Sequence, residues 1–146
     1  KYNQIYTSEQ AFFDDLEQMN SIIKAQTGND ASIIRFPGGS SNTVSKDYCP
    51  GIMTQLVNDV TARGLLYCDW NVSSGDANNK PISTEQVVQN VISGVKRHNV
   101  SVVLQHDIKD FSVNAVEQII QWGQANGYTF LPLTTSSPMS HHRVNN

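Results

Sequence analysis

Three short apolar segments, each followed at once by a cluster of polar or glycine residues, constrain the fold of this chain more than any other feature. The segments span residues 31–34, 65–68 and 100–104. Each has the length and composition of a buried β-strand. The clusters that follow contain Arg35, Asp69 and His106, and successive members lie 34 and 37 residues apart, about one strand, loop and helix. Because the carboxyl ends of parallel strands share one rim, we expect these side chains to meet there.

Amphipathic segments alternate with the strands. The first helix contains apolar residues at helical spacing, with an expected capping box of Thr7 and Gln10 and an end at Gly28. Later elements are expected as a helix from Pro50 to Arg63, a polar loop from Asn71 to Lys80, a helix capped by Ser83 or Thr84, a helix from Ser112 to about Asn126 and a strand at 128–131. This order predicts an α/β fold with parallel strands. Four strands cannot close a barrel, so the chain is either an open sheet or part of a larger barrel.

The composition narrows the range of partners. The chain has 146 residues, which is one domain's worth, a formal net charge of -3 and 16% charged residues, so a basic nucleic-acid face is not indicated. No apolar run reaches the length of a membrane span. A polar, weakly charged surface suits a neutral substrate such as a glycan. Cys49 and Cys68 are too few for a disulfide scaffold; a buried free thiol at Cys68 and a Cys49–Cys68 bridge both stay open.

The residues in the three clusters have side chains that could carry chemistry. His106 follows an apolar strand, and imidazole has an ordinary pKa of about 6.5, which suits a general acid or base. Asp69 could orient it, Arg35 could hold a carboxylate, and the Pro37–Gly39 backbone could approach an oxyanion. Each also has a structural interpretation: a loop-capping histidine or aspartate, an ordinary turn and, for Trp70, a core position instead of a pocket wall. No spacing typical of a metal site occurs in the sequence.

The clusters resemble three motifs of one family. Arg35-Phe36-Pro37-Gly38-Gly39, Leu66-Tyr67-Cys68-Asp69-Trp70 and Leu104-Gln105-His106-Asp107 are similar to the third, fourth and fifth motifs of the polysaccharide deacetylases, the NodB-like carbohydrate esterases of family four. The resemblance covers about residues 31–131. It implies that residues 1–146 are the C-terminal part of one catalytic domain, whose fold is a distorted (β/α) barrel of alternating helices and parallel strands.

The resemblance implies roles for individual residues. His106 would be the general acid that protonates the leaving group, Asp69 would tune His106, and Arg35 would hold a catalytic-base aspartate. The Gly38 N–H would donate to the oxyanion, where the family pattern has an aromatic residue. Trp70 and Leu104 would line the pocket for the acetyl methyl group.

The family's first two motifs, which supply the base and the metal ligands, have no counterpart in this sequence. A divalent metal, usually zinc, is therefore expected in the complete domain and on ligands upstream, with none in this chain, which alone is expected to be inactive. The expected partners are an acetylated glycan such as peptidoglycan or a chitin-like polymer, and either the missing N-terminal segment or a second copy of the chain. The resemblance also implies a secreted or cell-surface location. The alternative is a non-catalytic glycan-binding or interaction module that lacks the metal half.

Overall fold

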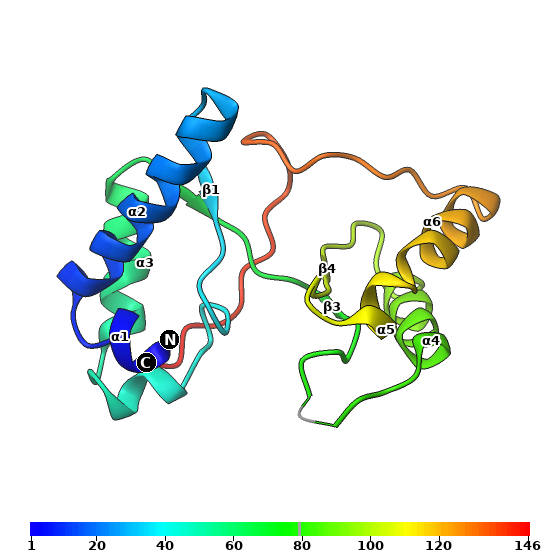
Figure 1. Cartoon of the computed structure of the whole chain (residues 1–146), viewed down its shortest axis with the longest axis horizontal. Coiled ribbons are helices and arrows are strands. Elements are labelled where there is room, and N and C mark those ends of the chain that lie inside the picture. The colour runs from blue at the N-terminus through cyan, green and yellow to red at the C-terminus, as the bar shows by residue number, and fades with distance from the viewer. Residues whose placement is uncertain (79) are drawn as a thin grey trace. The chain divides into compact units, whose positions relative to one another are not determined.

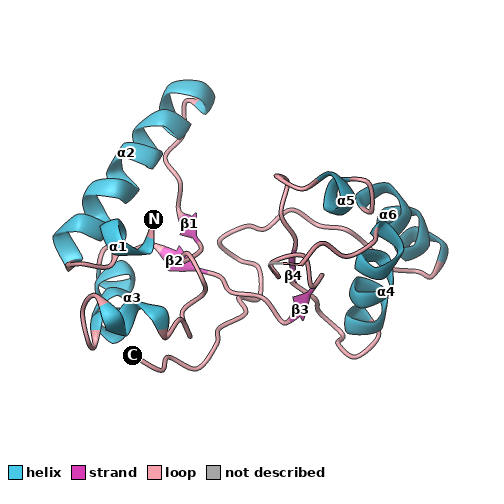
Figure 2. Cartoon of the chain, turned by 60° about the horizontal axis from the view of Figure 1, so that its bottom comes forward, coloured by secondary structure: helices cyan, strands magenta, loops and turns pink. Residues whose placement is uncertain are grey.

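The computed structural model describes residues 1–78 and 80–146. The chain forms two compact units, one of residues 1–69 and 134–146 and the other of residues 70–133. Figure 1 follows the chain through both units, and Figure 2 shows that each contains helices and a pair of very short strands. The expected α/β class is thus confirmed in its coarse form, with short parallel strands.

Unit one carries the first two strands and the helices around them. Its elements are α1 (Tyr2–Ile5), α2 (Glu9–Thr27), β1 (Ile33–Ile34), the 3-10 helix η1 (Val44–Asp47), α3 (Ile52–Ala62) and β2 (Leu66–Tyr67). β1 and β2 pair in parallel, with Ile33 opposite Leu66. Apolar side chains from the helices and from Phe36 form one buried core. This core fixes the position of the loop that follows β1.

Local signals explain where helix α2 begins and ends. Ser8 is its N-cap, and the Ser8 hydroxyl accepts a hydrogen bond from the Ala11 N–H at 3.1 Å. The expected cap at Thr7 is wrong by one residue, because the Thr7 hydroxyl donates to the Gln4 carbonyl at 3.1 Å and closes α1. The predicted end at Gly28 is confirmed by its φ of 76°, a conformation that glycine adopts without strain.

Unit two repeats the same design around a second strand pair. Its elements are β3 (Val72–Ser73), α4 (Thr84–Val95), β4 (Val103–Leu104), α5 (Asp110–Val113) and α6 (Val116–Ala125). β3 and β4 are parallel, with Ser73 opposite Leu104. Helices α4 and α6 bury valine, alanine and isoleucine side chains between them. Gly94 of α4 packs against Val72 so closely that a Cβ atom would not fit.

Unit two differs from the sequence expectation in three places. β3 lies in a stretch expected to be a loop, and the fourth expected helix is divided into α5 and α6. The expected strand at 128–131 is wrong. Instead, Gly127 has a φ of 79° and the Tyr128 N–H donates to the Gly123 carbonyl at 2.9 Å, which closes α6 in a Schellman arrangement.

Residues 134–146 return to unit one and are hydrogen-bonded to it. The Thr54 N–H donates to the Asn146 carbonyl at 2.7 Å, and the Gly51 N–H donates to the Asn146 Oδ1 at 2.7 Å. These bonds satisfy donors at the start of α3, which otherwise have no intrahelical acceptor. Val144 packs against the core of the unit. Among the described residues, no helix is both long and apolar enough to cross a membrane.

Candidate functional site

His106 and Asp76 form a hydrogen-bonded pair in unit two. The His106 Nδ1 lies 2.8 Å from the Asp76 Oδ1, and the His106 backbone N–H donates to the Asp76 Oδ2 at 2.6 Å. The Asp76 side chain is 1% exposed, whereas the His106 side chain is 31% exposed. The carboxylate is therefore shielded from solvent, whereas the partly exposed imidazole ring can contact a ligand.

The environment of Asp76 keeps its carboxyl group ionised. Burial by itself raises the pKa, but hydrogen bonds from Ser112 and from the side chain and backbone of His106 outweigh it and lower the pKa of Asp76 to about 2. The Ser112 hydroxyl donates to the Asp76 Oδ2 at 2.6 Å. Because an ionised carboxylate only accepts, the proton of this contact belongs to His106 Nδ1. The Nε2 atom is left to exchange a proton with a ligand.

Backbone register brings these residues together. Ser73 and Leu104 lie opposite each other on β3 and β4, so Asp76 and His106 follow three and two residues later on adjacent parallel strands. Ser112 approaches from α5, and Lys109 donates from Nζ to the Asp76 backbone carbonyl. Asp76 is not among the site residues predicted from the sequence, because residues 71–80 have the polar composition of a loop. The signal was Val72 before Ser74-Gly75-Asp76, an apolar position followed by a turn and an acid.

Asp69 lies in unit one, where its carboxylate is buried. It accepts from the Ser40 N–H at 2.8 Å, from the Ser40 hydroxyl at 2.5 Å and from the His142 N–H at 2.9 Å. The structure thus gives His106 a different carboxylate, Asp76, within its own unit. The pairing of Asp69 with His106 stays a prediction.

The loop after β1 presents Gly38. The Gly39 N–H donates to the Phe36 carbonyl at 2.7 Å, and Gly38 has a φ of 81°, so Phe36–Gly39 is a tight turn with proline second and glycine third. A Cβ atom on Gly38 would lie 2.5 Å from the Tyr2 hydroxyl. Gly38 is exposed, whereas Gly39 and Ser40 are buried. The Gly38 backbone is thus available to a ligand.

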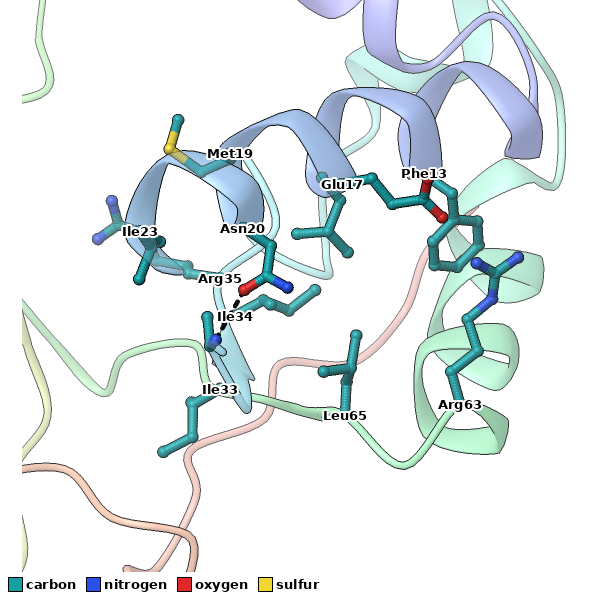
Figure 3. Close-up of a pocket in the computed structure, with 12 residues that line it drawn as sticks. Phe13, Glu17, Met19, Asn20, Ile23, Ile33, Ile34, Arg35, Arg63 and Leu65 are labelled. Carbon is teal, nitrogen blue, oxygen red and sulfur yellow. Dashed lines mark hydrogen bonds between the residues drawn. The ribbon is translucent and has the colours of Figure 1, made fainter. Parts of the chain in front are cut away.

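Arg35 lines a hollow of about 330 Å³ in unit one. Figure 3 shows the hollow between α2 and β1, with Arg63 at one end, where its guanidinium lies 3.3 Å from the centre of the Phe13 ring. The Asn20 side chain accepts from the Ala31 N–H at 2.7 Å and joins α2 to the strand. Most of the lining is apolar, and Arg35 is exposed. Its guanidinium can therefore reach a carboxylate supplied from elsewhere.

The structure also places the two predicted pocket-lining residues and the two cysteines. Trp70 is half-buried at the start of unit two, and Leu104 is buried on β4 of the same unit. Both cysteines are free thiols, and Cys68 is buried. Across residues 1–78 and 80–146, no three His, Cys, Asp or Glu side chains gather as a metal site would require. The described side chains therefore do not fit a resident metal.

Known proteins resemble this chain along most of its length. The catalytic domain of a peptidoglycan N-acetylglucosamine deacetylase from Eubacterium rectale is 97% identical over all of this chain and has a TM-score of 0.99. A CE4 esterase from Streptococcus mutans is 25% identical over 89% of this chain and 58% of its own, with a TM-score of 0.69. A curated peptidoglycan-N-acetylglucosamine deacetylase from Bacillus cereus is 28% identical over 82% of this chain.

The chain is shorter than these relatives. It spans 66% of the Eubacterium rectale catalytic domain and 42% of the Bacillus cereus deacetylase. No protein-family model matches the sequence. The motif order, the fold and the near-identity to a solved catalytic domain nevertheless agree, and the chain belongs to the polysaccharide deacetylase family.

Proposed function

We propose that the complete protein hydrolyses the N-acetyl groups of a peptidoglycan-like glycan, and that His106 protonates the departing nitrogen. The observation that carries this proposal is the buried, ionised Asp76 on the Nδ1 side of a partly exposed imidazole. Such a carboxylate fixes the tautomer and stabilises the imidazolium, so that Nε2–H can be delivered to a leaving group. The relatives named as peptidoglycan deacetylases supply the substrate class.

Two residues of unit one fit supporting roles in this reaction. The Gly38 N–H belongs to an exposed turn, which suits a donor to the oxyanion that forms when the acetyl carbonyl is attacked. Arg35 is exposed at the end of β1 and suits the orientation of a base carboxylate. Trp70 and Leu104 remain our proposed lining of the acetyl pocket. Asp69 as the tuning residue of His106 is the less supported role, because Asp76 already has that contact.

The rest of the domain would supply what this chain lacks. We propose that its short strand pairs are part of a distorted (β/α) barrel, with residues 1–146 as its C-terminal part. The catalytic base and the ligands of a divalent metal, zinc in our proposal, would lie in the part of the domain outside residues 1–146. Action on cell-wall glycan implies a secreted or cell-surface protein.

The test is a chimera in which these 146 residues replace the matching part of the Eubacterium rectale catalytic domain. Acetate release from N-acetylglucosamine oligomers and from peptidoglycan is measured for the chimera and for two histidine variants. His106→Asn should lower the rate at least about 100-fold, since general acid catalysis contributes about that much. His98→Asn, an exposed histidine after α4, is the matched control and should keep the rate. Glycan binding without acetate release would refute the proposal and favour a non-catalytic binding module.

A further inference from the structure

The acceptor contacts of Asp69 point to a function other than the one its sequence motif suggested. In the part of the chain that the structure describes, its three donors belong to unit one, two on Ser40 and one on His142. Its side chain is 1% exposed, so no part of the carboxylate is free for a large ligand. A buried carboxylate is stable only when donors of this kind surround it. Asp69 thus joins the loop after β1 to the C-terminal segment 134–146.

The loop that contains Gly38 is held on both sides. On one side, the Tyr6 hydroxyl donates to the Pro37 carbonyl at 2.7 Å, and Tyr6 is fully buried. On the other side, Asp69 holds both the N–H and the hydroxyl of Ser40. Gly38 lies between these anchors and is exposed. The anchors at Pro37 and Ser40 therefore help to hold the position of Gly38.

We propose that Asp69 is a positioning residue for the Gly38 N–H. The contacts of Asp69 with Ser40 and with residues 140–142 are called the Asp69 clamp below. The inference rests on the proposed function, in which that N–H donates to the oxyanion. An oxyanion donor lowers the barrier only when it is held in place before charge develops, and a displacement of about 1 Å is costly. Asp69 provides that rigidity by fixing Ser40, and its bond to the His142 N–H ties the C-terminal segment to the same loop.

The two possible roles of Asp69 differ in their pH dependence. A carboxylate that acts on His106 favours the imidazolium, so its removal would shift the alkaline limb of the activity profile to lower pH. A carboxylate that holds Ser40 leaves the profile in place and changes only its height. The substitution Asp69→Asn separates the two, because an amide has one acceptor oxygen for three donors. Whichever way it is turned, at least one N–H of Ser40 or His142 faces another donor.

The experiment uses the chimeric catalytic domain with Asp69→Asn, Ser40→Ala and their combination. Asp30→Asn is the control, since Asp30 is an exposed carboxylate bound to Lys24. We expect Asp69→Asn to lower kcat about 10- to 100-fold with a nearly unchanged KM and an unmoved pH profile. Ser40→Ala should act in the same direction and more weakly. The double variant should be no worse than Asp69→Asn, because both substitutions break one clamp.

Amide hydrogen exchange provides a readout that does not require activity. In Asp69→Asn, the Ser40 and His142 amides should exchange at least about 10-fold faster than in Asp30→Asn, since their acceptor is lost. Unaccelerated exchange, an unchanged kcat or a shifted alkaline limb would each overturn the inference. If the unsubstituted chimera releases no acetate, the proposed function fails, while exchange still tests the clamp. Should Asp69→Asn not fold, Ser40→Ala alone must lower kcat without moving the pH profile, and its failure to do so is equally decisive.

Discussion

Replacement of Asp76 by asparagine tests the electrostatics of the His106 site most directly. The pKa of Asp76 is lowered from 3.8 to about 2 in the folded chain. This difference corresponds to about 2 kcal/mol in favour of the folded state when the carboxylate is ionised in both states. Because the folded-state pKa is depressed, the stabilisation is complete above about pH 5 and is lost as the pH falls through 2. About 1 kcal/mol is gone at pH 3 and about 2 kcal/mol at pH 2.

Asparagine cannot titrate, so the Asp76→Asn variant should lack this pH-dependent contribution to the free energy of unfolding. The free energy of unfolding of unit two can be followed by tryptophan fluorescence in urea, since Trp70 and Trp122 are the two tryptophans of the chain and both lie in unit two. We expect Asp76→Asn to be less stable at pH 6 by at least about 2 kcal/mol, with a further cost where the amide faces a donor. The difference should shrink by about 1 kcal/mol at pH 3.

The control is Asp107→Asn, which makes the same chemical change at an exposed position next to His106. It should alter stability by less than about 0.5 kcal/mol at both pH values. A stability difference for Asp76→Asn that is the same at pH 6 and pH 3 would refute the reasoning, because it would mean that Asp76 is not selectively ionised in the folded state. Carboxyl carbon NMR of the native chain gives an independent test, with a midpoint expected near pH 2.

Three further predictions concern single contacts. Ser112→Ala removes the hydroxyl that donates to Asp76 at 2.6 Å, so the pKa of Asp76 should rise in the same NMR titration, and an unchanged midpoint would contradict the assignment. Gly38→Ala should lower the stability measured in urea by more than Gly28→Ala. Both glycines have a positive φ, but only at Gly38 would the added Cβ contact another atom. Equal losses of stability would count against the close approach of Tyr2. Arg63→Ala should lower the free energy of unfolding by about 1 kcal/mol through loss of the contact with the Phe13 ring. Lys24→Ala should lower it by less, because the ion pair of Lys24 with Asp30 is exposed. The reverse order in urea unfolding would refute this ranking.

The sequence predicted α2, α3 and α4 well because local signals mark where they begin or end. Gly28 ends α2, Ser83 caps α4 through a bond to the Gln86 N–H at 3.1 Å, and α3 ends just before Gly64. Errors arose where nonlocal contacts decide the outcome. Phe130 looked like part of a strand, but its ring packs over Gly123 of α6. An aromatic and β-branched segment is equally suited to a strand and to covering a helix, and periodicity alone does not distinguish them.

The candidate site illustrates the same limit for chemistry. Strand ends were identified correctly, yet which acid accompanies which histidine depends on register, which the sequence does not display. Within unit two, β4 pairs with β3, and this places Asp76 against His106. A two-residue strand such as β3 has too few apolar positions to stand out from a loop. Its existence follows from the partner strand, whose Val102 carbonyl accepts from the Val72 N–H at 3.1 Å.

The different roles proposed for Asp76 and Asp69 follow from the groups that surround each carboxylate. Asp76 has an imidazole among its donors, so its charge lies beside a group that can reach a ligand. Among the described residues, the donors to Asp69 are two backbone N–H groups and one hydroxyl, so loss of its carboxylate would alter the geometry of a loop. Under the two proposals made above, these buried carboxylates would act on one reaction by different physical routes, Asp76 through its charge beside the imidazole and Asp69 through the rigidity of the loop. The pH profile of the Asp69 variant and the acid titration of Asp76 measure these two routes separately.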